Sequence, residues 1–283
     1  MRCKSSYFIS LCLLVFTLPI FAWNAGGHEV IAQIAYDNLT PAVRQKVNHI
    51  LKARFISKYN DGRFLFAATW PDRIKNKTKK YNAWHYIGLP IVKDDVMPPP
   101  LNKRNVVWAI EHSERIVTHK NDALKKRAKY LSFLIHFVGD IHQPLHCATL
   151  YSKKFPPPQG DLGGNKYFIK SNIANNLHAY WDRGLGLLIN RRGGNYLNYY
   201  QVNQRANHWM KAFPKSFFAK KLQVKNPAEW AQESHALAKQ YAYAMPENTA
   251  PMPAYISNGK RVVKEQVVLA GYRLADVLNR TFS

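Results

Sequence analysis

Cysteine and acidic residues are both scarce in this chain. Its three cysteines are Cys3, Cys12 and Cys147, and the first two lie in a segment that we expect to be removed, so the mature chain cannot form an intrachain disulfide. Acidic residues number 17 against 41 lysines and arginines, which gives a formal net charge of +24. Because a disulfide is excluded, the stability of the chain outside the cytoplasm must come from core burial, from bound metal or from both.

Long apolar runs are scarce as well, apart from one at the amino terminus. Arg2 and Lys4 precede it and the small residue Ala22 ends it, which is the layout of a cleaved secretory signal spanning residues 1–22. The apolar run from Tyr7 to Phe21 is shorter than the roughly 20 residues of a membrane span. We expect Trp23 to begin a secreted or periplasmic monomer without a membrane anchor, with residues 23–283 forming one catalytic domain.

The positive charge that remains after loss of Arg2 and Lys4 attracts polyanions and speeds their encounter. Nucleic acid, anionic lipid and acidic polysaccharide all qualify as partners. A basic but inert solvated surface is an equally open interpretation at this stage.

Strand signals are few, and apolar residues recur at helical spacing in most of the chain. One window contains Val30 to Leu39, and Thr40 then caps a second helix with Pro41 at its first position. Further helical windows are 104–119, 122–141, 175–189, 196–213, 227–244 and 262–280. Only 166–170 is expected to join a short β-hairpin, and the proline-rich stretches 97–100 and 155–158 are expected to be loops. The sequence predicts an all-α, mainly helical single domain.

Two pairs of a histidine and an aspartate stand four residues apart in these windows. The first is His136 and Asp140 in His-Phe-Val-Gly-Asp, and the second is His178 and Asp182 in His-Ala-Tyr-Trp-Asp. Because residues four apart lie on one face of a helix, each pair projects in one direction. Imidazole nitrogen and carboxylate oxygen suit zinc. Each pair taken alone also fits a hydrogen-bonded core pair.

Five further residues can join these pairs. His146 stands in a Gln-Pro-Leu-His turn, Asp72 in Ala-Thr-Trp-Pro-Asp, His85 in Ala-Trp-His-Tyr, and Trp23 and His28 in Trp-Asn-Ala-Gly-Gly-His. The free α-amino group and the carbonyl of a terminal tryptophan can chelate a metal in a five-membered ring. A histidine beside a helix end is usually a structural residue. The convergence of all these residues in one chain favours a metal centre.

With these residues, the sequence resembles the trinuclear zinc single-strand nucleases of the S-one/P-one type, typified by mung bean nuclease. The motifs occur in the family's order from Trp23 to Asp182: Trp-x-x-x-x-His, Trp-x-Asp, Trp-His-Tyr, His-Phe-x-Gly-Asp-x-x-Gln-Pro-Leu-His, Gly-Gly-Asn and Asn-Leu-His-x-x-Trp-Asp. Beyond Asp182 the resemblance is only to a helical tail. It implies the helical fold shared by zinc phospholipase C and single-strand nucleases.

The resemblance implies three zinc ions. One is held by Asp72, His85, His136 and Asp140, a second by the Trp23 amino and carbonyl groups, His28 and a bridging Asp140, and the third by His146, His178 and Asp182. Two ions about 3.5 to 4 Å apart can share a water and lower its pKa, so that hydroxide attacks phosphorus in line. The third stabilises the departing 3′ oxygen. The products are then 5′-phosphates of single-stranded DNA and RNA, and 3′-mononucleotides are further expected substrates.

The resemblance also implies residues that bind substrate. Tyr86 corresponds to an aromatic platform on which an unpaired base stacks, an interaction worth roughly 1 to 3 kcal/mol. Leu162 corresponds to an apolar wall of the same pocket and Asn165 to a base-contacting asparagine. The alternatives are a packed core tyrosine for Tyr86 and an ordinary Gly-Gly-Asn turn for Asn165.

The sequence departs from the family pattern at several positions, besides lacking the usual disulfides. Lys75, expected with Asp72 and Asp140 to be catalytic, replaces an arginine near the scissile phosphate, and Arg73 is a rival for that role. Gly88 stands where relatives often carry an acid or amide that reads the base. Cys147 fits a buried inert thiol better than a thiolate ligand.

Two other functions compete with the nuclease. A zinc-dependent phospholipase C shares the fold, but its first histidine lies further from the tryptophan and its last ligand pair tends to be His-x-x-x-Glu. A non-catalytic basic protein that binds polyanions would bind in a salt-dependent manner and be indifferent to chelation. Retention of the complete ligand set favours the enzyme.

Overall fold

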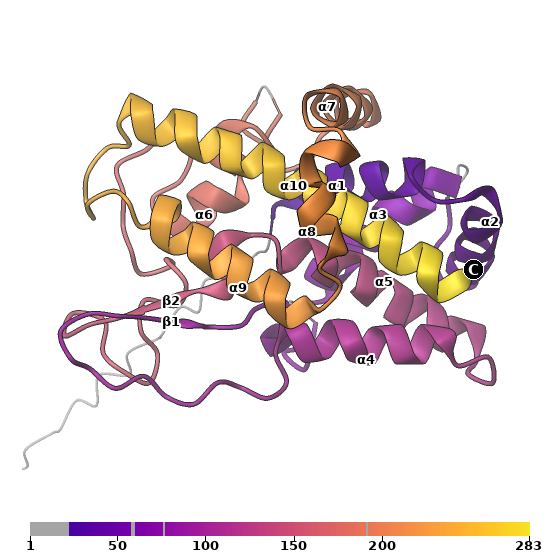
Figure 1. Cartoon of the computed structure of the whole chain (residues 1–283), viewed down its shortest axis with the longest axis horizontal. Helices are drawn as coiled ribbons and strands as arrows, with labels where there is room; N and C mark the ends of the chain where they lie inside the picture. Colours follow the sequence, from indigo (N-terminus) through magenta and orange to yellow (C-terminus); the bar gives the residue numbers. More distant parts are fainter. Residues whose placement is uncertain (1–22, 58–59, 76, 191) are drawn as a thin grey trace, which may run out of the picture.

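The computed structural model describes residues 23–57, 60–75, 77–190 and 192–283, and the predicted signal lies outside the described residues (Figure 1). The elements are α1 (Ala25–Asp37), α2 (Pro41–Lys52), α3 (Asn60–Ile74), η1 (Asn82–His85), β1 (Pro90–Val92), α4 (Val106–Thr118), α5 (Leu124–Asp140), η2 (Pro144–Cys147), β2 (Thr149–Tyr151), α6 (Leu177–Asp182), η3 (Gly184–Gly186), α7 (Tyr199–Ala212), η4 (Lys215–Phe218), α8 (Ala219–Gln223), α9 (Pro227–Leu237), η5 (Ala238–Ala242) and α10 (Pro253–Phe282). The prediction of an all-α fold is confirmed. No helix among the described residues has both the length and the apolar character needed to cross a bilayer.

Helix α5 lies in the interior, where it packs against α1, α2, α3, α4 and α10 (Figure 1). Its last ten residues, Leu131–Asp140, are all buried. A segment buried on every side has no solvent to satisfy its polar side chains, so Ser132, His136 and Asp140 must find partners inside the protein. Helix α5 therefore places polar side chains in the protein interior, where they contact other elements.

Helix α10 is the longest helix, with 30 residues, and it packs mainly on α1. Gly271 permits the close approach, because a Cβ at this position would lie 2.5 Å from Cγ2 of Ile34 and 3.1 Å from the Ile31 carbonyl oxygen. The carboxyl-terminal helix thus supports the helix on which His28 lies. It begins nine residues earlier than the predicted window, since Pro253 fits the first position of a helix.

Helix α3 was not predicted from the sequence. It contains Pro71, which lacks an N–H and would normally interrupt a helix. The carbonyl that Pro71 leaves without its helical donor is that of Ala67, and the Ser132 hydroxyl of α5 donates to it at 2.6 Å. The neighbouring Ala68 carbonyl is contacted by Nδ1 of His136 at 2.6 Å. Tertiary contacts with α5 thereby compensate the proline.

Most predicted helices are present with shifted ends. The Thr40 hydroxyl accepts from Val43 N at 3.3 Å with Pro41 at the first position of α2, as predicted. The window 175–189 is wrong in length, because Gly184 and Leu185 have φ of 58° and 51° and end α6 early. The window 227–244 becomes α9 followed by the π-turn η5.

The two strands of the described chain form a parallel pair, with Pro90 opposite Thr149 and Val92 opposite Tyr151. The hairpin expected at 166–170 is wrong as a strand prediction, since this segment makes an isolated antiparallel bridge between Phe168 and Asn176. The bridge cannot extend, because Asn176 already caps α6 by accepting from Ala179 N. Both proline-rich stretches are loops, as predicted.

Candidate metal centre

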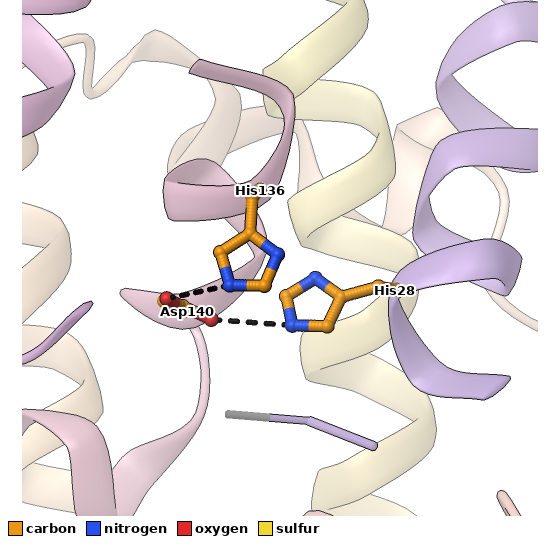
Figure 2. Close-up of side chains that lie close together, drawn as sticks. All are labelled: His28, His136 and Asp140. Carbon is orange, nitrogen blue, oxygen red and sulfur yellow. Dashed lines mark ion pairs between the residues drawn. The ribbon is translucent and has the colours of Figure 1, made fainter. Parts of the chain in front are cut away.

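The carboxylate of Asp140 is contacted by three imidazoles from three elements. Its Oδ1 lies 3.2 Å from Nε2 of His28 in α1, and its Oδ2 lies 3.3 Å from Nε2 of His136 in α5 (Figure 2). Nδ1 of His85, at the end of η1, lies 2.9 Å from the same Oδ2. All four side chains are fully buried. The structure therefore gathers three predicted ligands around the predicted bridging aspartate.

Asp72 adds a second carboxylate to this cluster. Its Oδ1 lies 3.5 Å from Nε2 of His136 and 3.8 Å from Nδ1 of His85. The Nζ of Lys75, one turn later, lies 2.6 Å from that Oδ1, and the side chain of Lys75 is only 8% exposed. Lys75 consequently directs its charge into the cluster.

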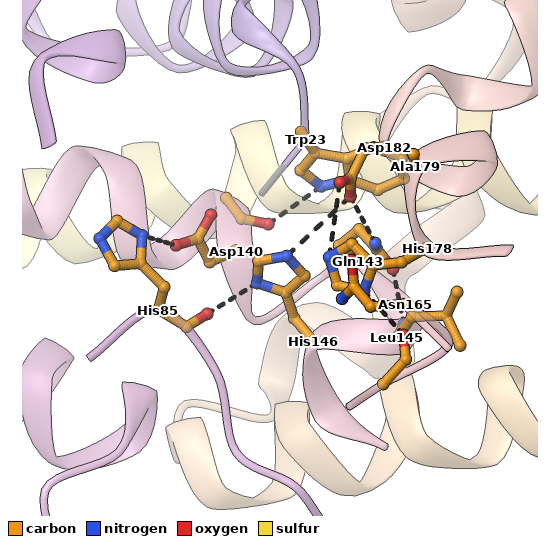
Figure 3. Close-up of polar contacts among 12 residues, drawn as sticks. Trp23, His85, Asp140, Gln143, Leu145, His146, Asn165, His178, Ala179 and Asp182 are labelled. Carbon is orange, nitrogen blue, oxygen red and sulfur yellow. Dashed lines mark hydrogen bonds and ion pairs between the residues drawn. The ribbon is translucent and has the colours of Figure 1, made fainter. Parts of the chain in front are cut away.

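A second cluster forms where η2 meets α6. Nε2 of His178 lies 3.4 Å from Oδ2 of Asp182, and Nε2 of His146 lies 3.9 Å from Oδ1 (Figure 3). Gln143 donates from Nε2 to the same Oδ1 at 2.7 Å. His146 approaches the first cluster as well, because its Nδ1 contacts the backbone carbonyl of His85 at 2.7 Å. The two clusters are thus parts of one centre.

Trp23 lies at the junction of the two clusters (Figure 3). It is completely buried, and its indole Nε1 donates to the Gly139 carbonyl, one residue before Asp140, at 3.0 Å. The next residue, Asn24, donates its backbone N–H to the Asp182 carbonyl at 3.0 Å. The backbone of Trp23 is therefore held between the end of α5 and the end of α6.

Backbone carbonyls fix the ring orientation of three histidines. Nδ1 of His136 contacts the Ala68 carbonyl at 2.6 Å, that of His146 the His85 carbonyl and that of His178 the Gly163 carbonyl, each of these two at 2.7 Å. A carbonyl that accepts from Nδ1 directs Nε2 at the carboxylates, so Nε2 is the atom available to a cation. This arrangement is usual for metal-binding histidines.

The donor set fits metal ions. Three groups have ligand atoms that all lie within 4.8 Å of one another: His28, His136 and Asp140; Asp72, His85 and His136; and His146, His178 and Asp182. Nδ1 of His28 and Nε2 of His85 are buried without a hydrogen-bond partner among the described atoms. Nitrogen and oxygen donors buried at this density are typical of a site for a divalent cation.

Burial and mutual charge set the protonation of the cluster. Burial lowers the pKa of His28 to about 4, and burial together with Lys75 lowers that of His85 to about 3. Burial alone would lower the pKa of His136, but the carboxylates of Asp140 and Asp72 outweigh it and raise that pKa to about 10. The cluster thus holds one proton between two carboxylates, and a bound cation would displace it.

A cavity of about 280 Å³ adjoins the second cluster, and His146 and His178 are in its wall. Tyr86 and Leu162, predicted to contact a base, line it together, and they are 37% and 39% exposed, so Tyr86 is not a packed core residue. Asn165 lies beside the cavity and outside its lining, with its side-chain amide donating to the Leu162 carbonyl at 2.8 Å.

Gly88 lines the same cavity. A residue on the neighbouring strand explains why position 88 holds a glycine. A Cβ at Gly88 would lie 2.8 Å from Oγ1 of Thr149, which also lines the cavity. The Thr149 hydroxyl therefore occupies the space that a larger residue at 88 would need. A hydroxyl replaces the acid or amide that the resemblance implied at this place.

Cys147 and Arg73 are also placed by the structure. The Cys147 thiol is fully buried and donates to the Ile141 carbonyl at 3.3 Å, and burial raises its pKa, so it is an inert thiol, as expected. Arg73 is exposed and stacks on Phe66, with its guanidinium carbon 4.4 Å from the ring centroid. Lys75, rather than Arg73, contacts Asp72.

Three residues that support the site were missed in the sequence. Pro71 leaves the Ala67 carbonyl available to Ser132, next to the Ala68 carbonyl that orients His136. Gln143 links the clusters, because its backbone N–H donates to the Asp140 carbonyl and its side-chain amide donates to Asp182. The only local signal was the position of Gln143 inside the Gln-Pro-Leu-His motif, because the other contacts join residues far apart in the chain.

Fold and site together define a helical protein with a buried histidine–aspartate centre able to hold metal ions. Residues 23–283 match the S1/P1 Nuclease family. The chain therefore belongs to this family and is a nuclease that hydrolyses phosphodiester bonds. It is 30% identical to Endonuclease 4 of Arabidopsis thaliana over 92% of this chain and 89% of that protein. It is 24% identical to Nuclease P1 of Penicillium citrinum over 91% and 97%, and 23% identical to Nuclease S1 of Aspergillus oryzae over 94% of each.

Proposed function

We propose that this protein is an exported, zinc-dependent endonuclease that cleaves single-stranded DNA and RNA, leaves 5′-phosphates and also dephosphorylates 3′-mononucleotides. The observation that carries this proposal is the meeting of three histidine–aspartate groups in one buried centre, beside which the Trp23 indole donates to the Gly139 carbonyl and the Asn24 N–H to the Asp182 carbonyl. Imidazole nitrogen and carboxylate oxygen are both ligands that zinc takes in proteins, and zinc is therefore the proposed ion.

The proposed ligand sets follow the three groups. Asp72, His85, His136 and Asp140 hold the first ion, the Trp23 amino and carbonyl groups with His28 and Asp140 hold the second, and His146, His178 and Asp182 hold the third. When bound, the ions would activate water and neutralise charge on the phosphate and the leaving oxygen. The placement of Asp140 between His28 and His85 supports its role as the shared ligand.

Lys75 supplies a fixed positive charge beside this centre. Burial alone would raise the pKa of Asp72, but the Lys75 ammonium and His136 outweigh it and hold that pKa well below its usual range. Asp72 therefore stays an anion available to a cation, and Lys75 attracts the scissile phosphate to the same place. The lysine ammonium acts as a point charge, whereas an arginine guanidinium would donate two parallel hydrogen bonds to the phosphate.

The cavity beside His146 and His178 supports the preference for single strands. A base that enters it can stack on Tyr86 against Leu162, but only when its face is not covered by neighbouring bases of a duplex. The Thr149 hydroxyl, which both donates and accepts, is the polar group at Gly88 that meets the base edge. The nucleotide in the cavity is then the one whose 3′ oxygen departs near His146 and His178.

Export and activity are linked through Trp23 in this proposal. The amino group of Trp23 must be free and unprotonated to bind a metal. Removal of residues 1–22 during export creates that group, so the signal directs the protein out of the cytoplasm and its cleavage completes the centre. A secreted or periplasmic location follows from the same step.

Metal analysis of the mature protein, paired with digestion assays, tests the function. The expected result is about three zinc ions per chain, cleavage of denatured DNA and of RNA to 5′-phosphates, slower cleavage of duplex DNA, and loss of activity with a chelator. Phosphatidylcholine is the comparison substrate. Lipid cleavage without DNA cleavage, or a fully active protein that carries no metal, would overturn the proposal.

A further inference from the structure

Exposed aromatic rings and one guanidinium form a surface that joins α3 to the start of α7. We call Phe66, Arg73, Tyr196 and Tyr199 the α3–α7 surface. The guanidinium carbon of Arg73 lies 4.4 Å from the centroid of the Phe66 ring and 5.7 Å from that of the Tyr196 ring. The Tyr199 hydroxyl donates to Asp61 in the first turn of α3. The three rings are 38%, 55% and 58% exposed.

Two links place this surface near the metal centre. Arg73 directly follows Asp72 on α3, with Asp72 directed into the buried cluster and Arg73 directed to the surface. The carbonyl of Asn195, just before Tyr196, accepts from Gly26 N at 2.9 Å in the first turn of α1. Helix α7 packs on α1, which carries His28 (Figure 1). Tyr196 is therefore held next to the turn that follows Trp23.

The surface and the base cavity adjoin different parts of the centre. The cavity has His146 and His178 in its wall, whereas the α3–α7 surface adjoins Asp72 and the start of α1. Under the proposed function, the nucleotide that loses its 3′ oxygen occupies the cavity. On the other side of the scissile phosphate, the α3–α7 surface is an exposed aromatic surface next to the start of α1, which carries His28.

We propose that the α3–α7 surface binds the nucleotides on the 3′ side of the scissile phosphate, with bases stacking on Phe66 and Tyr196 and a phosphate pairing with Arg73. This inference rests on the proposed function, which it extends from one nucleotide to a longer strand. Stacking on an aromatic ring accepts every base, and it contributes roughly 5- to 150-fold to binding per base. An arginine already stacked between rings is pre-ordered to meet a phosphate.

The surface distinguishes long substrates from short ones. The substrates are a thymidine dinucleotide and a hexathymidylate in which only the first linkage is cleavable. Tyr196→Ala and Phe66→Ala should each lower kcat/KM on the hexamer about tenfold and leave that on the dinucleotide within about twofold. Tyr196→Phe, which keeps the ring, should retain the hexamer rate. Phe217→Ala is the matched control, because the Phe217 ring is 56% exposed and packs on Phe213 and Phe218 instead.

A binding measurement supplies a readout that does not need catalysis. Fluorescence anisotropy of a labelled, cleavage-resistant dodecathymidylate with the metal-loaded protein should show about tenfold weaker binding for Tyr196→Ala. Because stacking rather than charge is lost, that ratio should be similar at about 0.15 M and 0.5 M salt. Thermal melting confirms that each variant is folded.

Two results would overturn the inference. An equal loss on dinucleotide and hexamer would mean that the variants act through the metal centre, and unchanged hexamer cleavage with unchanged binding would mean that the surface holds no strand. If the wild-type protein cleaves neither substrate, the proposed function fails, and the anisotropy measurement still decides whether the surface binds a strand.

Discussion

The imidazole rings of His28 and His136 stack on each other, with centroids 3.9 Å apart and planes 14° apart, and contact opposite oxygens of Asp140 (Figure 2). The rings come from α1 and α5, whose other contacts are largely apolar. Burial lowers the pKa of His28, and the charge of the stacked His136 lowers it further, because two adjacent imidazoles are not both protonated at low cost. Asp140 is the group on which the two helices converge.

Loss of the Asp140 charge should therefore be more damaging than loss of any ligand at the edge of the centre. We expect Asp140→Asn to lower kcat/KM by more than about 100-fold and to remove two ions, because it is proposed to touch both. His28→Ala should remove one ion and have a smaller effect. Metal analysis and initial rates on denatured DNA make the comparison, and equal effects would count against a shared ligand.

A residue placed before Trp23 should impair the centre. The added peptide bond replaces the amino group with an amide that cannot bind a cation. A chain beginning Ala-Trp23 should therefore hold fewer ions than one beginning at Trp23 and lose most of its activity. The same residue added after Ser283 is the control, and full activity of the amino-terminal extension would refute the proposed role of Trp23.

Lys75 should contribute to catalysis through its positive charge rather than through packing. We expect Lys75→Met to lower kcat/KM about 100-fold and Lys75→Arg to stay within about tenfold of the wild type. Lys77→Met, which removes an exposed lysine two residues later, is the matched control. Zinc content is measured in each variant, and an unchanged rate in Lys75→Met with full metal content would exclude the role.

Stability should depend on pH through Asp161, which lies outside the proposed ligand set. Burial raises the pKa of Asp161 to about 6, although Leu150 N, Gly164 N and the Tyr243 hydroxyl donate to it. The folded protein thus holds the proton more tightly than the unfolded chain, whose aspartates titrate near 3.9. The stabilisation is present below about pH 4 and is lost as pH rises through 6, by about 3 kcal/mol.

Chemical denaturation of the wild type and Asp161→Asn between pH 4 and 7 checks this prediction. The difference between their free energies of unfolding should change by about 2 kcal/mol over that window, to the disadvantage of the wild type at higher pH, because the unfolded aspartate is already about half titrated at pH 4. A constant difference would show that Asp161 keeps an ordinary pKa. The comparison removes the contribution of the other titrating groups, which both proteins share.

Features that depend only on residues close in sequence, such as helical faces and caps, were predicted correctly. His136 and Asp140 share a face because a helix repeats every 3.6 residues, and Thr40 with Pro41 starts α2 because a cap needs only its own turn. Helix α3 was missed although Phe64, Ala67, Ala68 and Pro71 follow a helical spacing and are all buried. The proline concealed that pattern, and the donor that compensates it, Ser132, lies on another helix.

The sequence by itself determined the chemistry available to this protein: an inventory of imidazoles and carboxylates, their pairing along helices, a large excess of positive charge and membership in a nuclease family. Only the tertiary structure decided that Thr149 fills the space at Gly88 and that Tyr196 meets Arg73 of α3. The physical reason is range. Helical periodicity acts over one or two turns, whereas these contacts join segments tens of residues apart, whose meeting depends on how the whole core packs.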